Sequence, residues 1–368
     1  ESLLNELQAG LNGLDLNENG AIDVLNGEGG LNSIGPLVLN WYSGSFFPDH
    51  VRLLGAGQVG TAQFYPVDGI PTAGLELSLY PVNDPAGSGL TYVLLLGNSD
   101  GTTVEERFLN LGPIGVEDFG IEARFEQDVP LYGRYDQILI ALVPEAESST
   151  ILEPSIVIFE AFFDGNAQAT LRNVLNGSGE EVASLLQRSV IEAALVLQHS
   201  GLMFDSLAAG DLAGGRLHAE HVINISVGDA DSRSGDLDGD GIPQNPSADG
   251  TGSIVYTDQI ATAIDEYAGT SAVTDRSEQV ATITMPRTLD HILISQNEII
   301  DLAIKVLSSD SAEEALQHAE LALATNDLIF EGIDFDESGV IDPLRGESGM
   351  NQIGILIHKL TEIGVTQK

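Results

Sequence analysis

Three stretches of the sequence place oxygen-bearing side chains at alternate positions ahead of a glycine. They begin at Asp15, Asp236 and Asp334, and each has Asp, Asn or Ser at positions 1, 3 and 5, Gly at position 6 and a carboxylate at position 14. Ca²⁺ takes about six to eight hard oxygen ligands, and alternate residues of a tightly turning chain provide them while glycine permits the turn. The spacing therefore predicts three calcium loops, which we call loop 1 (15–28), loop 2 (236–249) and loop 3 (334–347).

The expected ligands are the side chains at positions 1, 3, 5, 9 and 14 and the backbone carbonyl at position 7. They are Asp15, Asn17, Asn19, Ala21, Asp23 and Glu28 in loop 1; Asp236, Asp238, Asp240, Ile242, Gln244 and Asp249 in loop 2; and Asp334, Asp336, Ser338, Val340, Asp342 and Glu347 in loop 3. An apolar side chain at or next to position 7 (Ile22, Ile242, Ile341) is expected to anchor each loop to the core. Loop 2, with aspartate at positions 1, 3, 5 and 14, is expected to bind most tightly.

Two of these loops belong to a longer internal repeat. Residues 15–35 and 334–354 align without gaps and are identical at twelve of the 21 positions, among them both ends of the loop and the glycine at position 6. Asp, Asn and Gly also favour turns that bind no ligand. The carboxylate that all three loops share at position 14 favours calcium over a plain turn.

Histidines form a second candidate constellation. His218 and His221 are one helical turn apart and in line with Val222, so both are expected to face the interior of a helical bundle. Other histidines, His199, His291 and His318, fall on other expected helices. A transition-metal or haem site requires several of them to converge, whereas a helix-borne histidine more commonly bonds a carboxylate or a carbonyl. The sequence leaves both interpretations open.

Catalytic signatures are absent from the sequence. It contains no Gly-x-Ser-x-Gly, no His-Glu-x-x-His and no phosphate-binding loop. With this many carboxylates, some Asp/Glu pair always has a spacing that suits glycoside chemistry, so such a pair alone indicates nothing. We therefore expect that the protein is not an enzyme.

The charge is strongly acidic. Asp and Glu number 56 against 14 Lys and Arg, a net charge of −42. Nucleic acids and anionic membrane surfaces are bound by clustered basic residues, so neither is an expected partner, and cations are. A charge of this size destabilises a compact state unless bound divalent ions neutralise part of it, which favours a calcium-rich medium.

The remaining features of the sequence are those expected of a mature, soluble product. There is no cysteine, and no stretch approaches the roughly 18 apolar residues of a membrane span. The first residues carry no basic and apolar signal segment. We expect an extracellular or cell-surface protein, secreted after removal of a signal peptide, with no membrane insertion.

The periodicity of the chain divides it into three expected parts, which together predict a multidomain α and β protein. Residues 1–45 read as a helix–loop–helix around loop 1, residues 46–165 as an antiparallel β-sandwich, and residues 166–368 as an α-helical bundle with two calcium-binding loops. Strands are expected at 75–80, 92–96, 121–125, 138–142 and 156–159. Helices are expected at 179–207, 211–226, 254–267, 270–306, 311–331 and 349–364, with Asp310-Ser311 and Gly332 capping the fifth of them.

Three resemblances accompany these predictions. The loops resemble EF-hand and dockerin calcium loops through Asp-x-Asp/Asn-x-Asp/Asn/Ser-Gly, although their last carboxylate stands at position 14 instead of 12. The β segment, through Tyr-Val-Leu-Leu-Leu-Gly at 92–97 and Tyr-Asp-Gln-Ile at 135–138, is similar to the extracytoplasmic β-sandwich of anti-sigma-K-type factors. The helical segment, through His-Ala-Glu-His-Val-x-Asn-Ile at 218–225 and loop 2, is similar to a calcium-loop module of bacterial cell-surface proteins. These resemblances imply an extracytoplasmic location; no sigma-factor-binding segment is evident.

These features predict an extracellular calcium-binding structural protein that self-assembles, head to tail, into a filament, tube or surface layer. Its expected partners are Ca²⁺ and copies of itself. One alternative is a surface-attached module whose sandwich binds a glycan or a protein. A second alternative is a calcium-stabilised hydrolase or a metal-binding bundle.

Overall fold

The computed structural model describes residues 58–80, 82–117, 120–154, 156–177, 183–247, 249–270 and 275–367. The six expected ligands of loop 1 and the anchoring residue Ile22 lie outside these described residues. The described chain forms two compact units. We call them the helical unit, which contains 183–262 and 284–354, and the sheet unit, which contains the described residues of 58–177, 263–283 and 355–367. The protein is therefore mixed α and β.

The sheet unit is built on one antiparallel sheet of eight strands. Its spatial order is β4-β3-β6-β7-β8-β1-β2-β5, and every neighbouring pair runs antiparallel. The strands are β1 (Gln58–Val67), β2 (Ile70–Leu79), β3 (Leu90–Gly97), β4 (Phe108–Ile114), β5 (Ile121–Glu126), β6 (Gln137–Pro144), β7 (Val157–Phe162) and β8 (Ile363–Gln367). The predicted antiparallel sheet is confirmed, and its packing as a two-layer sandwich stays a prediction.

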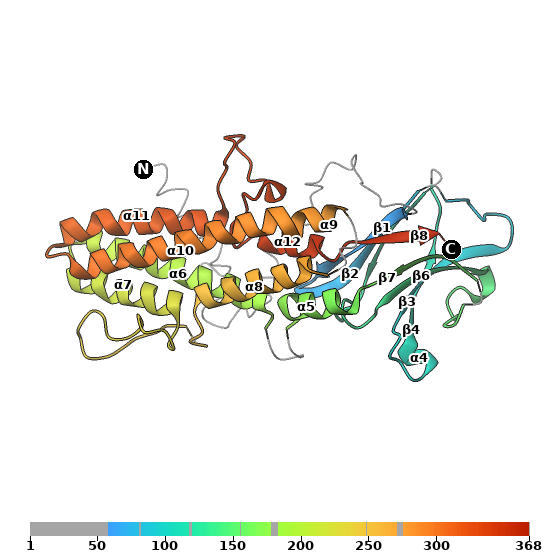
Figure 1. The fold of residues 1–368 in the computed structure, drawn as a ribbon, viewed down its shortest axis with the longest axis horizontal. Helices are drawn as coiled ribbons and strands as arrows, with labels where there is room; N and C mark the ends of the chain where they lie inside the picture. The colour runs from blue at the N-terminus through green and yellow to red at the C-terminus, as the bar shows by residue number, and fades with distance from the viewer. Residues whose placement is uncertain are drawn as a thin grey trace. The chain divides into compact units, whose positions relative to one another are not determined.

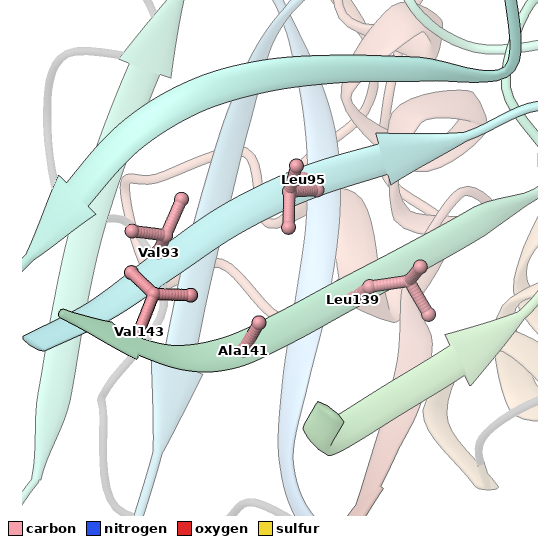
Figure 2. Packing of buried hydrophobic residues seen from close by; sticks show 5 residues of the cluster. All are labelled: Val93, Leu95, Leu139, Ala141 and Val143. Carbon is pink, nitrogen blue, oxygen red and sulfur yellow. The ribbon is translucent and has the colours of Figure 1, made fainter. Parts of the chain in front are cut away.

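One buried apolar cluster of the sheet unit lies on β3 and β6. Figure 2 shows Val93 and Leu95 of β3 beside three apolar residues of β6, and all five are buried. The register pairs Val93 with Ala141 and Leu95 with Leu139, so these side chains share one face of the sheet. The intervening residues of β3 are also buried, which explains why its sequence is a continuous apolar run instead of an alternating one.

The end of the chain corrects one expectation. The helix predicted over 349–364 is wrong in its last part, because α12 spans only Ile353–Lys359 and β8 follows it. β8 inserts between β7 and β1, which is about 300 residues earlier in the chain, with Ala62 opposite Ile363. A short apolar run does not distinguish a strand from a helix by periodicity, and the partner strands that decide the matter are distant in sequence.

Short helices complete the sheet unit. They are α4 (Val104–Arg107), a 3₁₀ turn at Glu145–Glu147, α5 (Gly165–Leu175) and α9 (Asp275–Gln279). α5 and α4 were not among the expected helices. α5 begins at Asp164, whose carboxylate accepts from the N–H groups of Asn166 and Ala167.

The helical unit contains the long amphipathic helices of the chain. They are α6 (Leu185–Ala208), α7 (Leu212–Val227), α10 (Met285–Ser308) and α11 (Ala312–Glu331), together with the part of α8 (Ser253–Ala268) that ends at Thr262. α6 packs on α7 and α11, and α10 packs on α7 and α11, so the four long helices lie alongside one another (Figure 1). The expected caps Ser311 and Gly332 bound α11. None of the described helices is long and apolar enough to cross a bilayer.

The helix expected over 270–306 is observed as one run of helical residues from 275 to 308 that contains a π-helical turn. α9 leads into a π-helical turn at Val280–Thr284, and α10 begins only at Met285. Pro286 lies in the first turn of α10, where its missing N–H and fixed φ are tolerated. The π-helical turn therefore lies directly before the proline, within one run of helical backbone.

Candidate calcium loops

Loops 2 and 3 each follow a helix that ends at a glycine with positive φ. α7 ends at Gly228 and α11 ends at Gly332, with φ of 81° and 104° respectively. The chain at the end of each loop bonds to the residue that follows this glycine. The N–H of Asp229 donates to the carbonyl of Gly250 at 2.8 Å, and the N–H of Ile333 donates to the carbonyl of Glu347 at 2.9 Å. Both loops are therefore closed at the base by backbone bonds.

The backbone of Gly228 lies so close to that of Thr251 that adding one methyl group at Gly228 is expected to lower the stability of the protein strongly. A Cβ on Gly228 would lie 2.1 Å from the carbonyl oxygen of Thr251, whereas a Cβ on Gly239, which has the same φ of 81°, would meet nothing within 4 Å. A positive φ strains either alanine, by about 1–2 kcal/mol in the left-handed α region. The ψ of 164° at Gly228 lies in a region that is essentially restricted to glycine. We expect Gly228→Ala to lower the unfolding free energy by at least about 1 kcal/mol more than Gly239→Ala, because overpacking adds to the backbone cost. Urea denaturation of both variants in calcium measures the difference, and equal losses would show that the base is not tightly closed.

Loop 3 brings three of its predicted ligands together. Carboxylate oxygens of Asp334, Asp336 and Glu347, which we call the loop 3 group, lie within 4.8 Å of one another. Glu347 is 2% exposed. Its Oε1 accepts from the N–H of Phe335 at 3.2 Å, and its Oε2 accepts from the N–H of Asp342 at 2.8 Å. The glutamate at position 14 thus holds the backbone at positions 2 and 9.

Loop 2 forms an equivalent group with a glutamate from outside the loop. Carboxylate oxygens of Glu220, Asp236 and Asp238, the loop 2 group, lie within 4.8 Å of one another. Glu220 belongs to α7 and is 0% exposed. Its Oε2 accepts from the N–H of Leu237 at 2.6 Å and of Asp238 at 3.0 Å, and its Oε1 accepts from the N–H of Gln244 at 2.7 Å. Leu237 and Gln244 stand at positions 2 and 9, so Glu220 makes the bonds that Glu347 makes in loop 3.

Asp249, the expected closing ligand of loop 2, is not part of the loop 2 group. Its Oδ1 accepts from the N–H of Thr251 at 2.8 Å, and its Oδ2 accepts from the hydroxyl of Tyr256. The sequence pattern missed Glu220 because that residue precedes the loop instead of ending it. One feature of α7 marks Glu220: it is a carboxylate inside the run 219–227, which is buried throughout. Charged side chains are rarely buried without a partner, so such a residue is a candidate ligand.

A second residue of α7 holds loop 2 in place. The side chain of Asn224 accepts from the N–H of Gly235 at 3.0 Å and donates to the carbonyls of Gly235 at 2.9 Å and Gln244 at 2.7 Å. Asn224 lies one helical turn after Glu220, so one face of α7 positions both ends of the ligand segment.

The other predicted ligands occupy the rim of their loops. Asp240 accepts from the N–H of Ile242 at 2.7 Å, and Asp342 accepts from the N–H of Leu344 at 3.0 Å. Ser338 bonds to Asp334 and to the carbonyl of Val340. None of these side chains belongs to the loop 2 or loop 3 group.

The expectation that apolar residues near position 7 anchor the loops is wrong for Ile242. Its side chain is 61% exposed, and that of Val340 is 52% exposed, while Ile341 is half-buried. Glu220 and Glu347 hold the loops through backbone N–H groups instead, so an apolar contact at position 7 is not required.

The two groups differ in their compensating charge. The guanidinium of Arg345 contacts Asp336 and lies 3.3 Å from Oδ2 of Asp342. Among the described residues, no Lys or Arg forms an ion pair with the loop 2 group. The N–H of Gly339 also lowers the pKa of Asp334. The negative charge of loop 2 is therefore the less compensated of the two.

Both groups fit a hard divalent cation. Two oxygens bound to one Ca²⁺ at about 2.3–2.6 Å lie at most about 5 Å apart, and the 4.8 Å limit of both groups meets this condition. Every donor in the two groups is a carboxylate oxygen, which is the ligand type that Ca²⁺ and Mg²⁺ prefer. Softer metals prefer thiolate or imidazole ligands. In loop 2 the ion would be held by Asp236, Asp238 and Glu220. In loop 3 it would be held by Asp334, Asp336 and Glu347.

The structure also answers the question of the histidines. His199, His218 and His221 converge, whereas His291 stacks edge-on against Phe335 at 5.7 Å between ring centres. His318 is not part of the converging group. The histidines on α6 and α7 are therefore a second candidate metal site, separate from the carboxylate groups.

Comparison of the chain with protein-family models, with curated proteins and with solved structures gave no match.

Proposed function

We propose that this chain is an extracellular calcium-binding structural protein that assembles with copies of itself. One observation carries the calcium part of the proposal. Two loops about 100 residues apart each place two aspartates and a buried glutamate within 4.8 Å, and in both loops the glutamate accepts from the N–H groups at positions 2 and 9. Backbone N–H groups compensate the buried glutamate in each loop, but three carboxylates this close together repel one another, and a cation between them would relieve that repulsion.

The sequence of loop 1 extends the proposal to a third site. Loop 1 shares with loop 3 the aspartate at position 1, the glycine at 6, the aspartate at 9 and the glutamate at 14. Since loop 3 uses its glutamate to close the group, Glu28 is the expected closing residue of loop 1. The full chain would then bind about three calcium ions, which offset part of its net charge of −42.

The sheet unit supports a structural role. Val93 and Leu95 on one face of β3, and Leu94 and Leu96 on the other, are all buried. Other parts of the chain therefore cover this strand on each side, which suits a rigid unit. We keep the two-layer sandwich predicted from the strand spacing as the finer description of this sheet. A rigid sandwich joined to a calcium-stabilised helical unit suits a building block.

Assembly follows from the duplicated segment. A helix–loop–helix of about 45 residues buries too little apolar surface to be stable alone, so the apolar residues of 31–41 need a host. That host is either the helical unit of the same chain or that of the next copy. The second arrangement is a head-to-tail contact, which propagates into a filament when it does not close into a ring. We favour it because it gives a function to a repeat that the chain carries at both ends.

Deleting residues 1–45 is expected to leave a folded protein that no longer assembles. Asp15→Ala is expected to weaken assembly without unfolding the rest, because it removes one ligand of loop 1 and leaves loops 2 and 3 intact. Sedimentation and negative-stain microscopy in millimolar calcium and in chelator measure assembly, and circular dichroism of the helices checks folding. A full-length protein that stays monomeric at high concentration in calcium would refute the head-to-tail contact, and the repeat would then pack within one chain.

A further inference from the structure

Three histidines converge between α6 and α7, and none of them is an expected ligand of the calcium loops. His199 lies on α6, and His218 and His221 lie one turn apart on α7. α6 and α7 are joined by residues 209–211 and pack along their length. His199 and His221 are 8% and 7% exposed, and His218 is half-buried. His218 is thus the ring of the group most accessible to solvent.

The ring nitrogens are spaced as metal ligands are. Nδ1 of His199 lies 3.2 Å from Nδ1 of His218 and 3.2 Å from Nδ1 of His221. Nitrogens bound to one tetrahedral Zn²⁺ at about 2.0–2.1 Å are about 3.3–3.4 Å apart, which is the edge of that tetrahedron. The observed separations match this edge closely.

Hydrogen bonding among the rings does not explain the arrangement. A ring nitrogen carries at most one hydrogen, which points along the ring plane. When Nδ1 of His199 carries a hydrogen, it can donate well to only one of its two neighbours. When it carries none, no hydrogen lies between it and a second unprotonated Nδ1. A cation that accepts all three lone pairs gives every nitrogen a partner.

Gln244 sets the tautomer that such a site requires. Its Oε1 lies 3.4 Å from Nε2 of His221, and its Nε2 lies 3.5 Å from Oδ2 of Asp240. The contact with the Asp240 carboxylate requires the amide nitrogen on that side, so the amide oxygen faces His221. Nε2 of His221 then carries the proton, and Nδ1 directs its lone pair at His199. An outer hydrogen bond of this kind is the usual companion of a histidine that binds a metal.

Burial favours the uncharged form of all three rings. Burial, reinforced by the neighbouring rings, lowers the pKa of His199 to about 3 and the pKa of His218 to about 4. Burial also lowers the pKa of His221. An uncharged imidazole is the form that binds a metal ion.

We propose that His199, His218 and His221 bind one transition-metal cation of the zinc class through their Nδ1 atoms. Three imidazole nitrogens suit Zn²⁺, Co²⁺, Ni²⁺ or Cu²⁺ and do not suit Ca²⁺, which takes oxygen ligands. With three protein ligands, the fourth tetrahedral position is left for water, on the side of His218. The proposal is independent of calcium binding by the loops.

The test titrates Zn²⁺ and Co²⁺ into the metal-stripped full chain with excess Ca²⁺ present, so that the carboxylate groups are not available to the probe metals. One Zn²⁺ per chain is expected, with a micromolar or lower dissociation constant, and Co²⁺ should give the intense visible bands of a tetrahedral nitrogen site. We expect His218→Ala to weaken zinc binding by at least about 100-fold and to abolish the tetrahedral cobalt spectrum. Gln244→Leu should weaken binding by about 10–100-fold, as loss of an outer-shell partner does.

His318→Ala is the matched control, because this histidine lies on α11 outside the group, and it should bind zinc as the unmodified chain does. Circular dichroism without zinc checks that each variant is folded; a His218→Gln variant replaces His218→Ala if the alanine variant unfolds. Absence of a site that survives excess calcium would overturn the proposal. So would a cobalt spectrum that is octahedral, or one that His218→Ala leaves unchanged.

Discussion

Chelation of calcium is expected to destabilise the helical unit more than any single substitution. An ion that binds only the folded state stabilises it by RT ln(1 + [L]/Kd), which is about 4 kcal/mol when the free ion is about a thousand times Kd. Two independent sites, in loops 2 and 3, would together contribute about 8 kcal/mol. The loss of stability is expected to be large because chelation removes the cation from between the carboxylates of each group. The buried Glu220 and Glu347 then lie beside aspartates of the same charge.

Thermal melts in millimolar calcium and in chelator measure this effect through the helical signal in circular dichroism. The double variant Asp236→Asn with Asp334→Asn is the control, since it removes the first ligand of both described loops. Its two melts should lie much closer together than those of the unmodified chain. Superimposed melts of the unmodified chain would show that calcium does not stabilise the fold.

The second large effect is expected at Glu220. Glu220→Gln keeps the size of the side chain but removes the negative charge and one of the two oxygens that accept backbone N–H groups. We expect the calcium affinity of loop 2 to fall at least about 100-fold, which is about 2.8 kcal/mol at 1.4 kcal/mol per tenfold change. Glu347→Gln should have the same effect in loop 3, because its carboxylate makes the equivalent bonds.

Asp249→Asn is the matched control for Glu220→Gln. Asp249 is the acidic residue at position 14 of loop 2, but its carboxylate bonds to Thr251 and Tyr256. This variant is expected to keep the calcium affinity of loop 2 within about threefold. Calorimetric titration, which should find about three sites in the unmodified chain, resolves the loss of one. If Asp249→Asn abolishes the site and Glu220→Gln leaves it intact, the closing ligand of loop 2 is Asp249 at position 14 and not Glu220.

The contrast between the loops also orders their affinities. Arg345 is paired with Asp336 and Asp342 in loop 3, so an ion that enters there competes with a guanidinium. Loop 2 has no such pair among the described residues, and its group carries three carboxylates, one of them fully buried. The structure therefore adds a reason to the expectation, drawn from ligand charge alone, that loop 2 binds calcium most tightly.

Local features of this protein were determined by the sequence. The aspartates at positions 1 and 3 of loops 2 and 3 converge because a glycine turn brings alternate residues of one short segment together, and that geometry depends only on neighbours in the chain. The same holds for α7 and α11, whose apolar period and capping residues fixed their ends to within about two residues. The strands β3 and β6 were predicted for a similar reason, since their apolar runs are long and bounded by turn residues.

Tertiary structure decided which distant residues meet. Glu220 closes loop 2 because α7 turns one face toward the loop, and His199 joins His218 because α6 and α7 pack at a particular rotation about their axes. β8 exists as a strand because β7 and β1 leave room between them for its backbone to pair. Helix rotation and strand pairing depend on contacts across the whole unit, which the spacing of residues along one segment does not encode.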